Sequence, residues 1–332
     1  MEKLRLGVLG CSGHCARMIA PPLRHSRLIE LYAVASRDEA KARQYAAQHG
    51  FPKSYGSYEA LLEDAMVDFV YIPLPNHLHL EYIQKSADAG KPVICEKPIC
   101  LNADETVQAA QYCRQRNIPL MEAFMYRFHP QWVKAKEIVS SGEIGEVLAV
   151  HGHFSYSNKD ENNIRNKTDC GGGALYDIGC YAVSGARFLF GREPERVLCS
   201  LVRDSSFKTD IFTSGILDFG GGGTATFTAS TQMFSFQQVS AVGSGGSLIV
   251  ELPFSMSADV PARFTVNGST GQRLIETKPA DQYLLEFEAF ADAFIHKTEV
   301  PTPVTDAIAN IAVLDALFRS AESGTWEPVK HA

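Results

Sequence analysis

The chain has 332 residues, a formal net charge of −7 and a pI of about 5.8. This acidic composition, without a cluster of Lys and Arg, argues against nucleic acid or an anionic membrane surface as the main partner. No apolar run approaches the roughly 18 residues that a membrane span needs, and the first residues lack the charged-then-apolar form of a signal peptide. We therefore expect a cytoplasmic protein that binds a small molecule.

The cysteine pattern gives no sign of a metal centre. The eight cysteines include no Cys-x-x-Cys pair, and none has a histidine at zinc-ligand spacing. We expect them to be reduced and mostly buried, and we expect no metal site.

Strand-like and helical segments alternate in the first part of the chain. The predicted strands are Leu4–Leu9, Ile29–Ala35, Phe69–Ile72, Val93–Cys95 and Leu120–Phe124. This alternation predicts a mostly parallel sheet covered by helices on both faces, which is a Rossmann-type α/β domain. We assign residues 1–122 to it.

Residues 123–332 are expected to form a second domain of α+β type. Helical patterns cover Pro130–Ser140, Ala174–Phe190, Gln282–His296 and Asp306–Glu322. Short strand patterns cover Val197–Val202, Phe212–Phe219, Gly223–Ala229, Gln237–Val242, Ser247–Leu252, Arg263–Val266 and Arg273–Thr277. Short, often alternating strands between Gly-rich turns predict a large, open, mostly antiparallel sheet.

The turn after the first strand reads Gly10-Cys11-Ser12-Gly13-His14 and precedes a helical segment. A full dinucleotide fingerprint is Gly-x-Gly-x-x-Gly, and here Ser12 and Cys15 occupy the second and third glycine positions. A first strand that leads through small residues into a helix places backbone N–H groups against a pyrophosphate. We predict dinucleotide binding here; the alternative is a tight turn without a ligand.

The second strand ends in Ser36-Arg37-Asp38. NAD-selective proteins carry a carboxylate at this place for the ribose hydroxyls, whereas Arg37 offers a donor fork suited to a phosphate. We therefore favour NADP, with NAD as a possibility. Asp38 is expected to cap the next helix.

The segment Glu96-Lys97-Pro98 follows the fourth predicted strand. Ligands of open α/β sheets bind at the carboxyl ends of strands, so Lys97 is a candidate catalytic residue. The alternative is a loop lysine that carries charge in water.

Three further segments accompany this one in order. They are Pro73-Leu74-Pro75-Asn76-His77-Leu78-His79, Glu122-Ala123-Phe124-Met125-Tyr126-Arg127-Phe128-His129-Pro130 and Gly171-Gly172-Gly173-Ala174-Leu175-Tyr176-Asp177-Ile178-Gly179-Cys180-Tyr181. Together the four segments resemble the glucose-fructose oxidoreductase and inositol dehydrogenase family (Gfo/Idh/MocA) over essentially the whole chain. The resemblance implies a Rossmann domain followed by an open antiparallel sheet, through which members assemble as homodimers or homotetramers.

The resemblance also implies site residues. Pro73, Leu74, Asn76, His79, Glu96 and Lys97 are expected near the nicotinamide. The Asp-x-Gly-x-His/Tyr motif supplies Asp177 and, at the acid/base position, Tyr181, so that Lys97, Asp177 and Tyr181 are the expected catalytic residues. Without the resemblance, the alternative interpretation of Tyr181 is an aromatic residue that fills space by packing at the start of a helix. With a tyrosine at this position, the chain resembles the branch of the family that contains aldose dehydrogenases, dihydrodiol dehydrogenases and deoxysugar ketoreductases.

Candidate substrate contacts, besides Asp177 and Tyr181, are Tyr126, Arg127 and Arg165. Polar donors of this kind suit a sugar or polyol, whose hydroxyls must be paired once buried. We expect an NADP-dependent oxidoreductase that moves a hydride to or from a carbinol carbon of a sugar or vicinal diol. Aldose 1-dehydrogenase is the first expectation, ahead of trans-dihydrodiol dehydrogenase and ketosugar reductase. The alternatives are a non-catalytic NADP-binding sensor and a cofactor-assisted hydrolysis or elimination.

Overall fold

The computed structural model describes residues 2–330, and the chain divides into two compact units. The first unit comprises Met1–Met125 and Tyr283–Ala307, and the second comprises Tyr126–Gln282 and Ile308–Ala332. A single division after residue 122 therefore does not hold, because Tyr283–Ala307 belongs with the first unit. The physical reason is the apolar packing of helix α8 described below.

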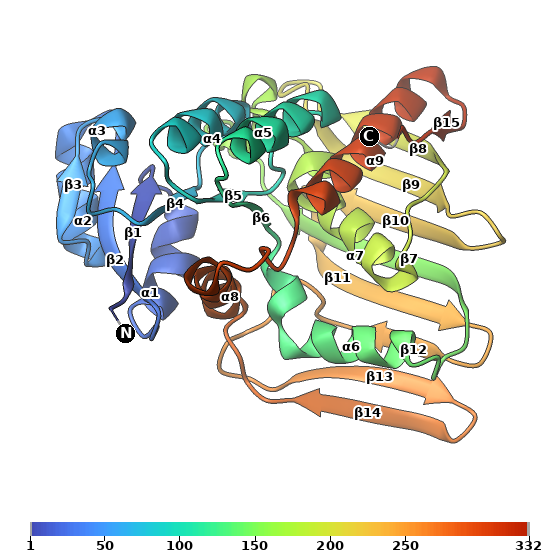
Figure 1. Ribbon diagram of the computed structural model, residues 1–332. Helices are drawn as coiled ribbons and strands as arrows, with labels where there is room; N and C mark the ends of the chain where they lie inside the picture. The colour runs from blue at the N-terminus through green and yellow to red at the C-terminus, as the bar shows by residue number, and fades with distance from the viewer. Residues whose placement is uncertain (1, 331–332) are drawn as a thin grey trace. The chain divides into compact units, whose positions relative to one another are not determined.

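The first unit is built on a six-stranded parallel sheet in the order β3-β2-β1-β4-β5-β6 (Figure 1). Its strands are β1 (Leu4–Leu9), β2 (Ile29–Ala35), β3 (Lys53–Tyr55), β4 (Phe69–Ile72), β5 (Val93–Glu96) and β6 (Leu120–Ala123). The predicted Rossmann-type sheet is confirmed, although the three-residue β3 was not predicted. The chain order reverses between β1 and β4, which is where such sheets bind dinucleotides.

Helices cover both faces of this sheet. They are α1 (Ala20–Leu23), α2 (Glu39–His49), α3 (Tyr58–Leu62), α4 (His79–Asp88), α5 (Ala103–Gln115) and α8 (Gln282–His296). The side chain of Asp38 accepts the amide of Lys41 at 3.0 Å and so caps α2, as predicted. Buried residues of α3, α4 and α5 form one apolar cluster with Val70 and Ile72.

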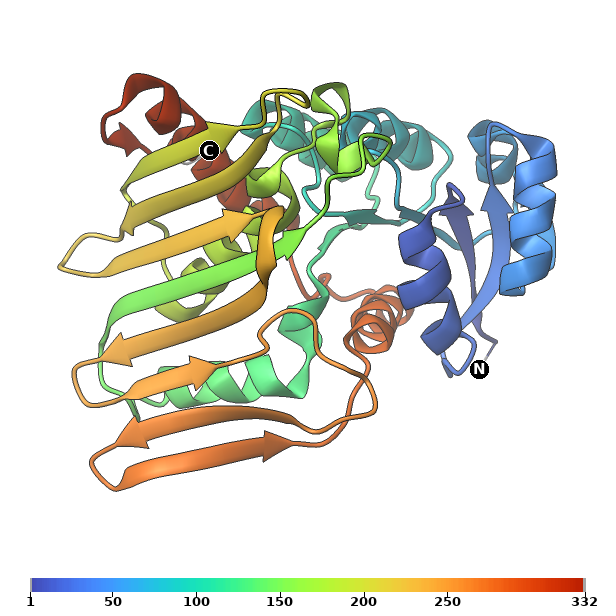
Figure 2. The same ribbon diagram turned by 180° about the vertical axis from the view of Figure 1, so that it is seen from behind.

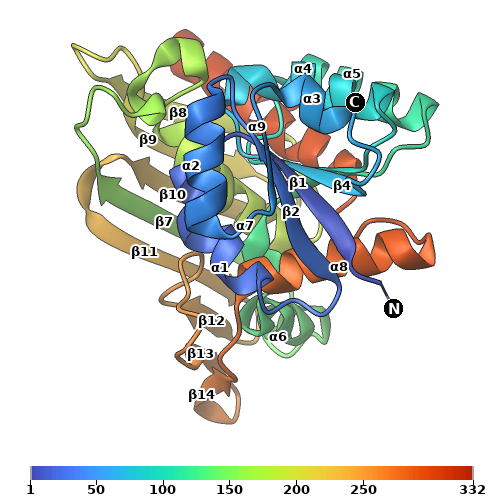
Figure 3. The same ribbon diagram turned by 90° about the vertical axis from the view of Figure 1, so that its left-hand side faces the viewer.

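Helix α8 covers the opposite face. Phe287 and Phe290 place their rings 5.1 Å from Tyr71 and 5.7 Å from Phe69, respectively. Since successive strand residues point to opposite faces, α8 and the α3–α5 layer lie on different sides of β4, as Figure 3 shows. Phe287 and Phe290 thus lie on the face of α8 that packs against the sheet.

The second unit is built on a nine-stranded sheet in the order β14-β13-β12-β11-β7-β10-β9-β8-β15. Its strands are β7 (Val147–Ser157), β8 (Arg196–Arg203), β9 (Asp210–Asp218), β10 (Thr224–Ser230), β11 (Gln232–Gly243), β12 (Ser247–Val250), β13 (Ala262–Gly268), β14 (Gly271–Thr277) and β15 (Glu327–Pro328). Among the strand pairs of this sheet within residues 2–330, only β7–β10 is parallel, so the predicted mostly antiparallel sheet is confirmed. The central strand β7 was missed by the sequence-based prediction.

One face of this sheet carries helices and the other is open (Figures 1 and 2). The helices are α6 (Pro130–Ser140), α7 (Cys180–Phe190) and α9 (Val304–Ser323). Helix α7 approaches β7 so closely that a Cβ on Gly152 would lie 3.1 Å from the Cβ of Ala182. Within residues 2–330, no helix has both the length and the apolar character to cross a membrane.

Candidate functional site

The turn after β1 has the backbone that a phosphate cradle needs. Gly10 has φ +120°, a conformation that residues with a side chain rarely adopt, and a Cβ there would lie 3.0 Å from Leu74 Cδ2. The Oγ of Ser12 accepts the amide of Cys15 at 2.9 Å, where the π-helical turn Cys15–Ile19 begins. A bare backbone beside a helical start fits the pyrophosphate of a dinucleotide.

Two cations lie near the carboxyl end of β2. Burial raises the pKa of the Tyr58 hydroxyl, and the positive charge of Arg37 opposes this rise. The exposed Arg37 guanidinium therefore lies close to the Tyr58 hydroxyl. In the same way, burial raises the pKa of the Cys11 thiol and the charge of Lys41 opposes it. Ser36 is buried beside them. The sequence reasoning missed Lys41, although its place in the first turn of α2 was a usable signal.

The loop after β4 is held from inside by His79. This side chain is fully buried, and its Nδ1 and Nε2 lie 3.0 Å from the carbonyl oxygen of Pro98 and 2.8 Å from that of Leu74. Burial lowers the pKa of His79. Pro73 and Asn76 are partly exposed in the same loop. The imidazole therefore contacts backbone in the interior, and its influence on a cofactor site passes through the two loops that it joins.

Glu96, at the end of β5, is anchored by its neighbours in the first unit. The hydroxyl of Tyr71 donates to Glu96 Oε1 at 2.5 Å, and His14 Nε2 lies 3.5 Å from the same oxygen. Burial raises the pKa of Glu96, but these two partners and the charge of Lys97 lower it to about 2. The His14 ring also packs edge-on against Tyr283 at 5.5 Å. Two predicted cofactor residues, His14 and Glu96, are thus joined, and Glu96 is an anion near neutral pH.

Two more carboxyl groups surround the turn that carries Lys97. Glu122 on β6 is buried, and its Oε1 accepts the amide of Ile99 at 2.8 Å. Glu286 on α8 is 1% exposed, and burial together with the charges of Glu96 and Glu122 raises its pKa well above the usual range. These surroundings favour the neutral form of the Glu286 carboxyl group. Sequence reasoning missed it because it lies within an apolar packing stripe.

In the second unit, Asp177 is held on both carboxylate oxygens. Arg165 Nε donates to Oδ1 at 2.9 Å, and the hydroxyl of Tyr156 donates to Oδ2 at 2.5 Å. The Asp177 side chain is 12% exposed and that of Arg165 is 41% exposed. The structure thus joins two predicted substrate residues. Tyr156 was missed because β7 was missed, although apolar and aromatic residues alternate along that strand.

Tyr181 lies among aromatic rings. It is 7% exposed, and its ring centroid is 5.2 Å from Phe254, 5.8 Å from Phe154 and 6.1 Å from Tyr126. Asp177 precedes it by four residues in a continuous helical segment, so both side chains share one face. The apolar surroundings disfavour an ionised phenol, and a neighbouring cation is needed to offset this effect.

Tyr126 and Arg127 both contact α7 at one serine. The Tyr126 hydroxyl lies 2.7 Å from Ser184 Oγ, and Arg127 Nη2 donates to the same oxygen at 2.8 Å. The Arg127 guanidinium also lies 5.3 Å from the centre of the Phe188 ring. Tyr126 is fully buried, and its ring centroid lies 6.1 Å from that of Tyr181.

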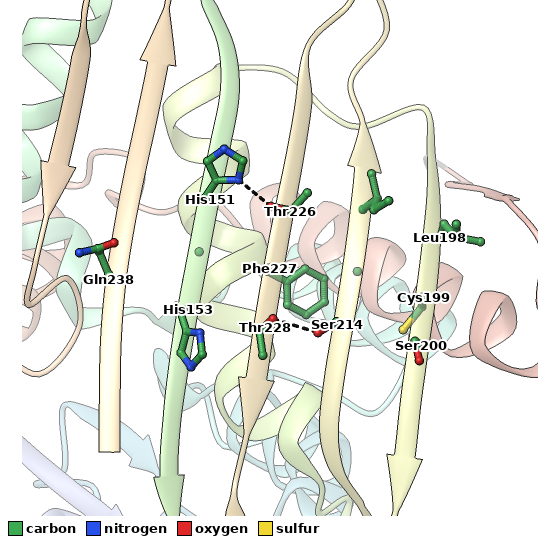
Figure 4. A pocket seen from close by; sticks show the side chains of 13 residues that line it. His151, His153, Leu198, Cys199, Ser200, Ser214, Thr226, Phe227, Thr228 and Gln238 are labelled. Carbon is green, nitrogen blue, oxygen red and sulfur yellow. Dashed lines mark hydrogen bonds between the residues drawn. The ribbon is translucent and has the colours of Figure 1, made fainter. Parts of the chain in front are cut away.

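A cavity of about 630 Å³ lies on the open face of the nine-stranded sheet (Figure 4). It is lined by His151, Gly152, His153, Leu198, Cys199, Ser200, Ser214, Gly215, Ile216, Thr226, Phe227, Thr228 and Gln238. Its polar side chains bond to one another across strands: His151 Nδ1 lies 2.7 Å from Thr226 Oγ1, and Ser214 Oγ lies 2.9 Å from Thr228 Oγ1. None of the predicted catalytic or cofactor residues lines this cavity.

Known families match both halves of the chain. A family described as an oxidoreductase family with an NAD-binding Rossmann fold matches residues 4–124. The GFO/IDH/MocA C-terminal domain matches residues 132–249.

Individual relatives match the chain over nearly its full length. An uncharacterised oxidoreductase of Rhizobium meliloti is 40% identical over 99% of this chain and 100% of its own length. D-xylose 1-dehydrogenase (NADP(+)) 2 of Haloferax volcanii is 39% identical over 97% of this chain and 98% of its own. A crystal structure of a 3-ketoreductase from Actinomadura kijaniata, in complex with NADP and TDP-benzene, has a TM-score of 0.91 and 29% identity, covering 96% of this chain and 98% of that one. As the motifs predicted, the chain belongs to the GFO/IDH/MocA family of NAD-binding oxidoreductases.

Proposed function

We propose that this protein is an NADP-dependent oxidoreductase that transfers a hydride between the nicotinamide and a carbinol or carbonyl carbon of a sugar or vicinal diol. Aldose 1-dehydrogenase activity is favoured over trans-dihydrodiol dehydrogenase and ketosugar reductase activities. The observation that carries this choice is the 39% identity to D-xylose 1-dehydrogenase (NADP(+)) 2 over 97% of the chain. A non-catalytic sensor would have no need of both Lys97 and Tyr181.

The charges at the end of β2 support NADP over NAD. Ser36 and Arg37 stand where NAD-selective proteins carry a carboxylate. Arg37 can bind a 2′-phosphate through its planar fork, and the nearby Lys41 adds a second positive charge. In this proposal the Gly10 turn holds the pyrophosphate and these two cations hold the 2′-phosphate.

Tyr181 and Lys97 are the proposed proton-handling pair. When bound, the nicotinamide accepts or supplies the hydride, so the protein must remove or supply the proton of the carbinol. A tyrosine with a pKa of about 10 is a poor base near neutrality. An ammonium about 4 Å away, at an effective dielectric near 20, is worth roughly 4 kcal/mol, or about 3 pKa units. Burial opposes part of this, and Lys97 supplies the charge in our proposal.

The same pair is supported by the ketoreductase of Actinomadura kijaniata. Crystal structures of that protein include variants in which one tyrosine or one lysine is replaced. Those two residues have the same separation along their chain as Lys97 and Tyr181 have here. Asp177, held by Arg165 and Tyr156, completes the proposed set by binding the substrate.

We also propose that the chain assembles as a homodimer or homotetramer through the open face of the nine-stranded sheet. Large apolar side chains are exposed there: Val202 is 51%, Phe236 is 49% and Val242 is 43% exposed. The Phe236 ring lies 5.1 Å from that of the cavity residue His153. Light scattering should show an oligomer that Phe236→Lys weakens and that Val133→Lys, on α6, leaves intact. A monomeric wild type at micromolar concentration would contradict this assembly.

A cytoplasmic location is proposed from the cysteines. All eight are free thiols, and six of them are buried. Unpaired thiols persist in reducing compartments. Fractionation of cells that express the protein at its natural level checks this.

The function is tested by a screen of aldoses, ketosugars and vicinal diols with NADP and NADPH, followed at the nicotinamide absorbance. We expect turnover of at least one aldose with NADP, and slower turnover with NAD. Tight NADPH binding without turnover of any substrate would overturn the enzyme assignment in favour of the sensor. Product formation without net change in NADPH would point to hydrolysis or elimination instead.

A further inference from the structure

Two side chains of strand β7 contact two side chains of the helical segment that carries Asp177 and Tyr181. Phe154 and Tyr156 are two apart on the strand and so point to the same face, about 7 Å apart. Asp177 lies in the π-helical turn Leu175–Gly179, and Tyr181 follows four residues later in α7, so the two side chains are about one helical turn apart. The Phe154 ring lies 5.8 Å from the Tyr181 ring, and the Tyr156 hydroxyl lies 2.5 Å from Asp177. The strand therefore supports each member of the motif with a separate side chain.

The direction of the hydrogen bond between Tyr156 and Asp177 follows from their charges. Burial and the negative charge of Asp177 raise the pKa of Tyr156, so its hydroxyl stays protonated and donates. With Arg165 donating to the other oxygen, both partners favour the ionised carboxylate. A carboxylate has about four acceptor positions, and the Asp177 side chain is 12% exposed, so a substrate hydroxyl can reach it.

The glycine-rich turn explains why Arg165 is in place. A Cβ on Gly172 would collide with the carbonyl oxygen of Arg165 and lie 2.7 Å from its carbonyl carbon. The next residue, Gly173, has φ +125° beside the buried Asp210. Asp210 in turn accepts the amide of Leu175 at 2.7 Å, at the start of the helical segment that carries Asp177. The turn thus brings the Arg165 backbone against the base of the motif helix.

From this geometry we propose that Tyr156 is a positioning residue: together with Arg165 it orients the Asp177 carboxylate to accept a hydrogen bond from an uncharged hydroxyl of the substrate. This inference rests on the proposed function and adds a specificity rule to it. A hydroxyl can donate to Asp177, whereas a carboxylate or phosphate at the same position would be repelled. Tyr156 acts only through Asp177, and the subsite selects a neutral polyol.

The test uses an aldose that the wild-type enzyme oxidises, together with the monodeoxy analogues of that aldose. The kcat/KM of each sugar is measured for wild type, Tyr156→Phe and Asp177→Asn. In wild type, removal of one particular hydroxyl should lower kcat/KM by about tenfold or more, because a hydrogen bond to a charged acceptor is lost. In both variants the kcat/KM of the parent sugar should fall, and the penalty for that deoxy analogue should shrink to about threefold or less. The affinity for NADPH should stay within about twofold of wild type.

Tyr112→Phe is the matched control, because it also removes a tyrosine hydroxyl that donates to an aspartate. The hydroxyl of Tyr112, on α5, donates to Oδ1 of Asp88, on α4, at 2.9 Å. It should retain the wild-type deoxy penalty. If Tyr156→Phe does not fold, as judged by circular dichroism, Arg165→Lys carries the same test, since it keeps the charge and loses the planar fork. A deoxy penalty in Tyr156→Phe equal to that of wild type overturns the inference while leaving the proposed function intact. A wild type that neither oxidises nor reduces any sugar or diol overturns the proposed function itself.

Discussion

The imidazole of His79 joins two loops that flank the predicted nicotinamide site, with its Nδ1 3.0 Å from the carbonyl oxygen of Pro98. Its other nitrogen lies 2.8 Å from the carbonyl oxygen of Leu74. The turn that presents Lys97 is therefore held by the buried side chain of the first residue of α4. Ile99, just beyond Pro98, is held in turn by Glu122.

Replacing His79 with Phe should lower both the thermal midpoint and kcat. The two buried carbonyl groups lose their polar neighbour, and an unpaired buried group costs about 1–3 kcal/mol. His79→Gln should be milder, since its amide can donate to one carbonyl. His25→Phe, at an exposed position in the same unit, is the control for thermal unfolding and turnover. A His79→Phe variant with the thermal unfolding midpoint of wild type would contradict the proposal that His79 holds the two loops together.

Arg37→Ala should raise the KM for NADP by about tenfold or more, because a charge-assisted contact to the 2′-phosphate is lost. The KM for NAD, which lacks that phosphate, should change little. Arg43→Ala is the control: Arg43 lies on α2, its side chain is 71% exposed, and it forms an ion pair with Glu39 one helical turn away. Equal effects of Arg37→Ala on both cofactors would rule out its role in selectivity.

Tyr181→Phe should lower kcat by at least about 100-fold, which is the lower end of what a positioned acid or base contributes. NADPH affinity, measured by fluorescence titration, should be retained. Tyr176→Phe is a control from the same helical segment, where the ring packs 5.0 Å from Phe318. A fully active Tyr181→Phe enzyme would refute the proton-transfer role.

Glu96→Gln should flatten the dependence of stability on acid pH. The pKa of Glu96 in the folded protein is about 2, against an ordinary value of 4.5. Its ionised form therefore contributes stability that is fully present above about pH 4.5 and is lost as pH falls towards 2. Urea unfolding between pH 6 and pH 3 should show a smaller loss of unfolding free energy in the variant than in wild type.

Asp64 offers a control for this measurement, because its pKa is also lowered to about 2. Asp64→Asn should likewise flatten the stability profile, but it should leave the KM for NADP unchanged. Only Glu96→Gln should alter both properties. Identical unfolding profiles for wild type and Glu96→Gln would remove the basis of this prediction.

Gly172→Ala should destabilise the glycine-rich turn and reduce kcat/KM for the substrate, because the added methyl group collides with the Arg165 carbonyl. Overpacking of this kind typically costs about 1–3 kcal/mol. Gly268→Ala is the control, since a Cβ there meets no atom within 4 Å. Thermal unfolding and substrate kinetics are compared between the two variants. Equal midpoints and equal kcat/KM values would show that the glycine-rich turn can accommodate the added methyl group.

Sequence patterns predicted the features that depend on neighbouring residues. These features are the strands of the Rossmann sheet, apart from the short β3, and the Asp38 cap of α2. Both depend on local signals, and the structure contains them. The pattern failed at β7, where alternation runs through Gly152 and two histidines and so has a weak apolar contrast. Losing β7 also meant losing Tyr156.

By itself the sequence determined the family, the motif residues and the chemistry expected of them, because residue type and spacing along one turn or strand are local properties. Only the tertiary structure decided which partner each motif residue has. Tyr156 and Asp177 are 21 residues apart, and His79 and Pro98 are 19 apart. Contacts of this range depend on which strand lies beneath which helix and in what register, and no local pattern carries that information.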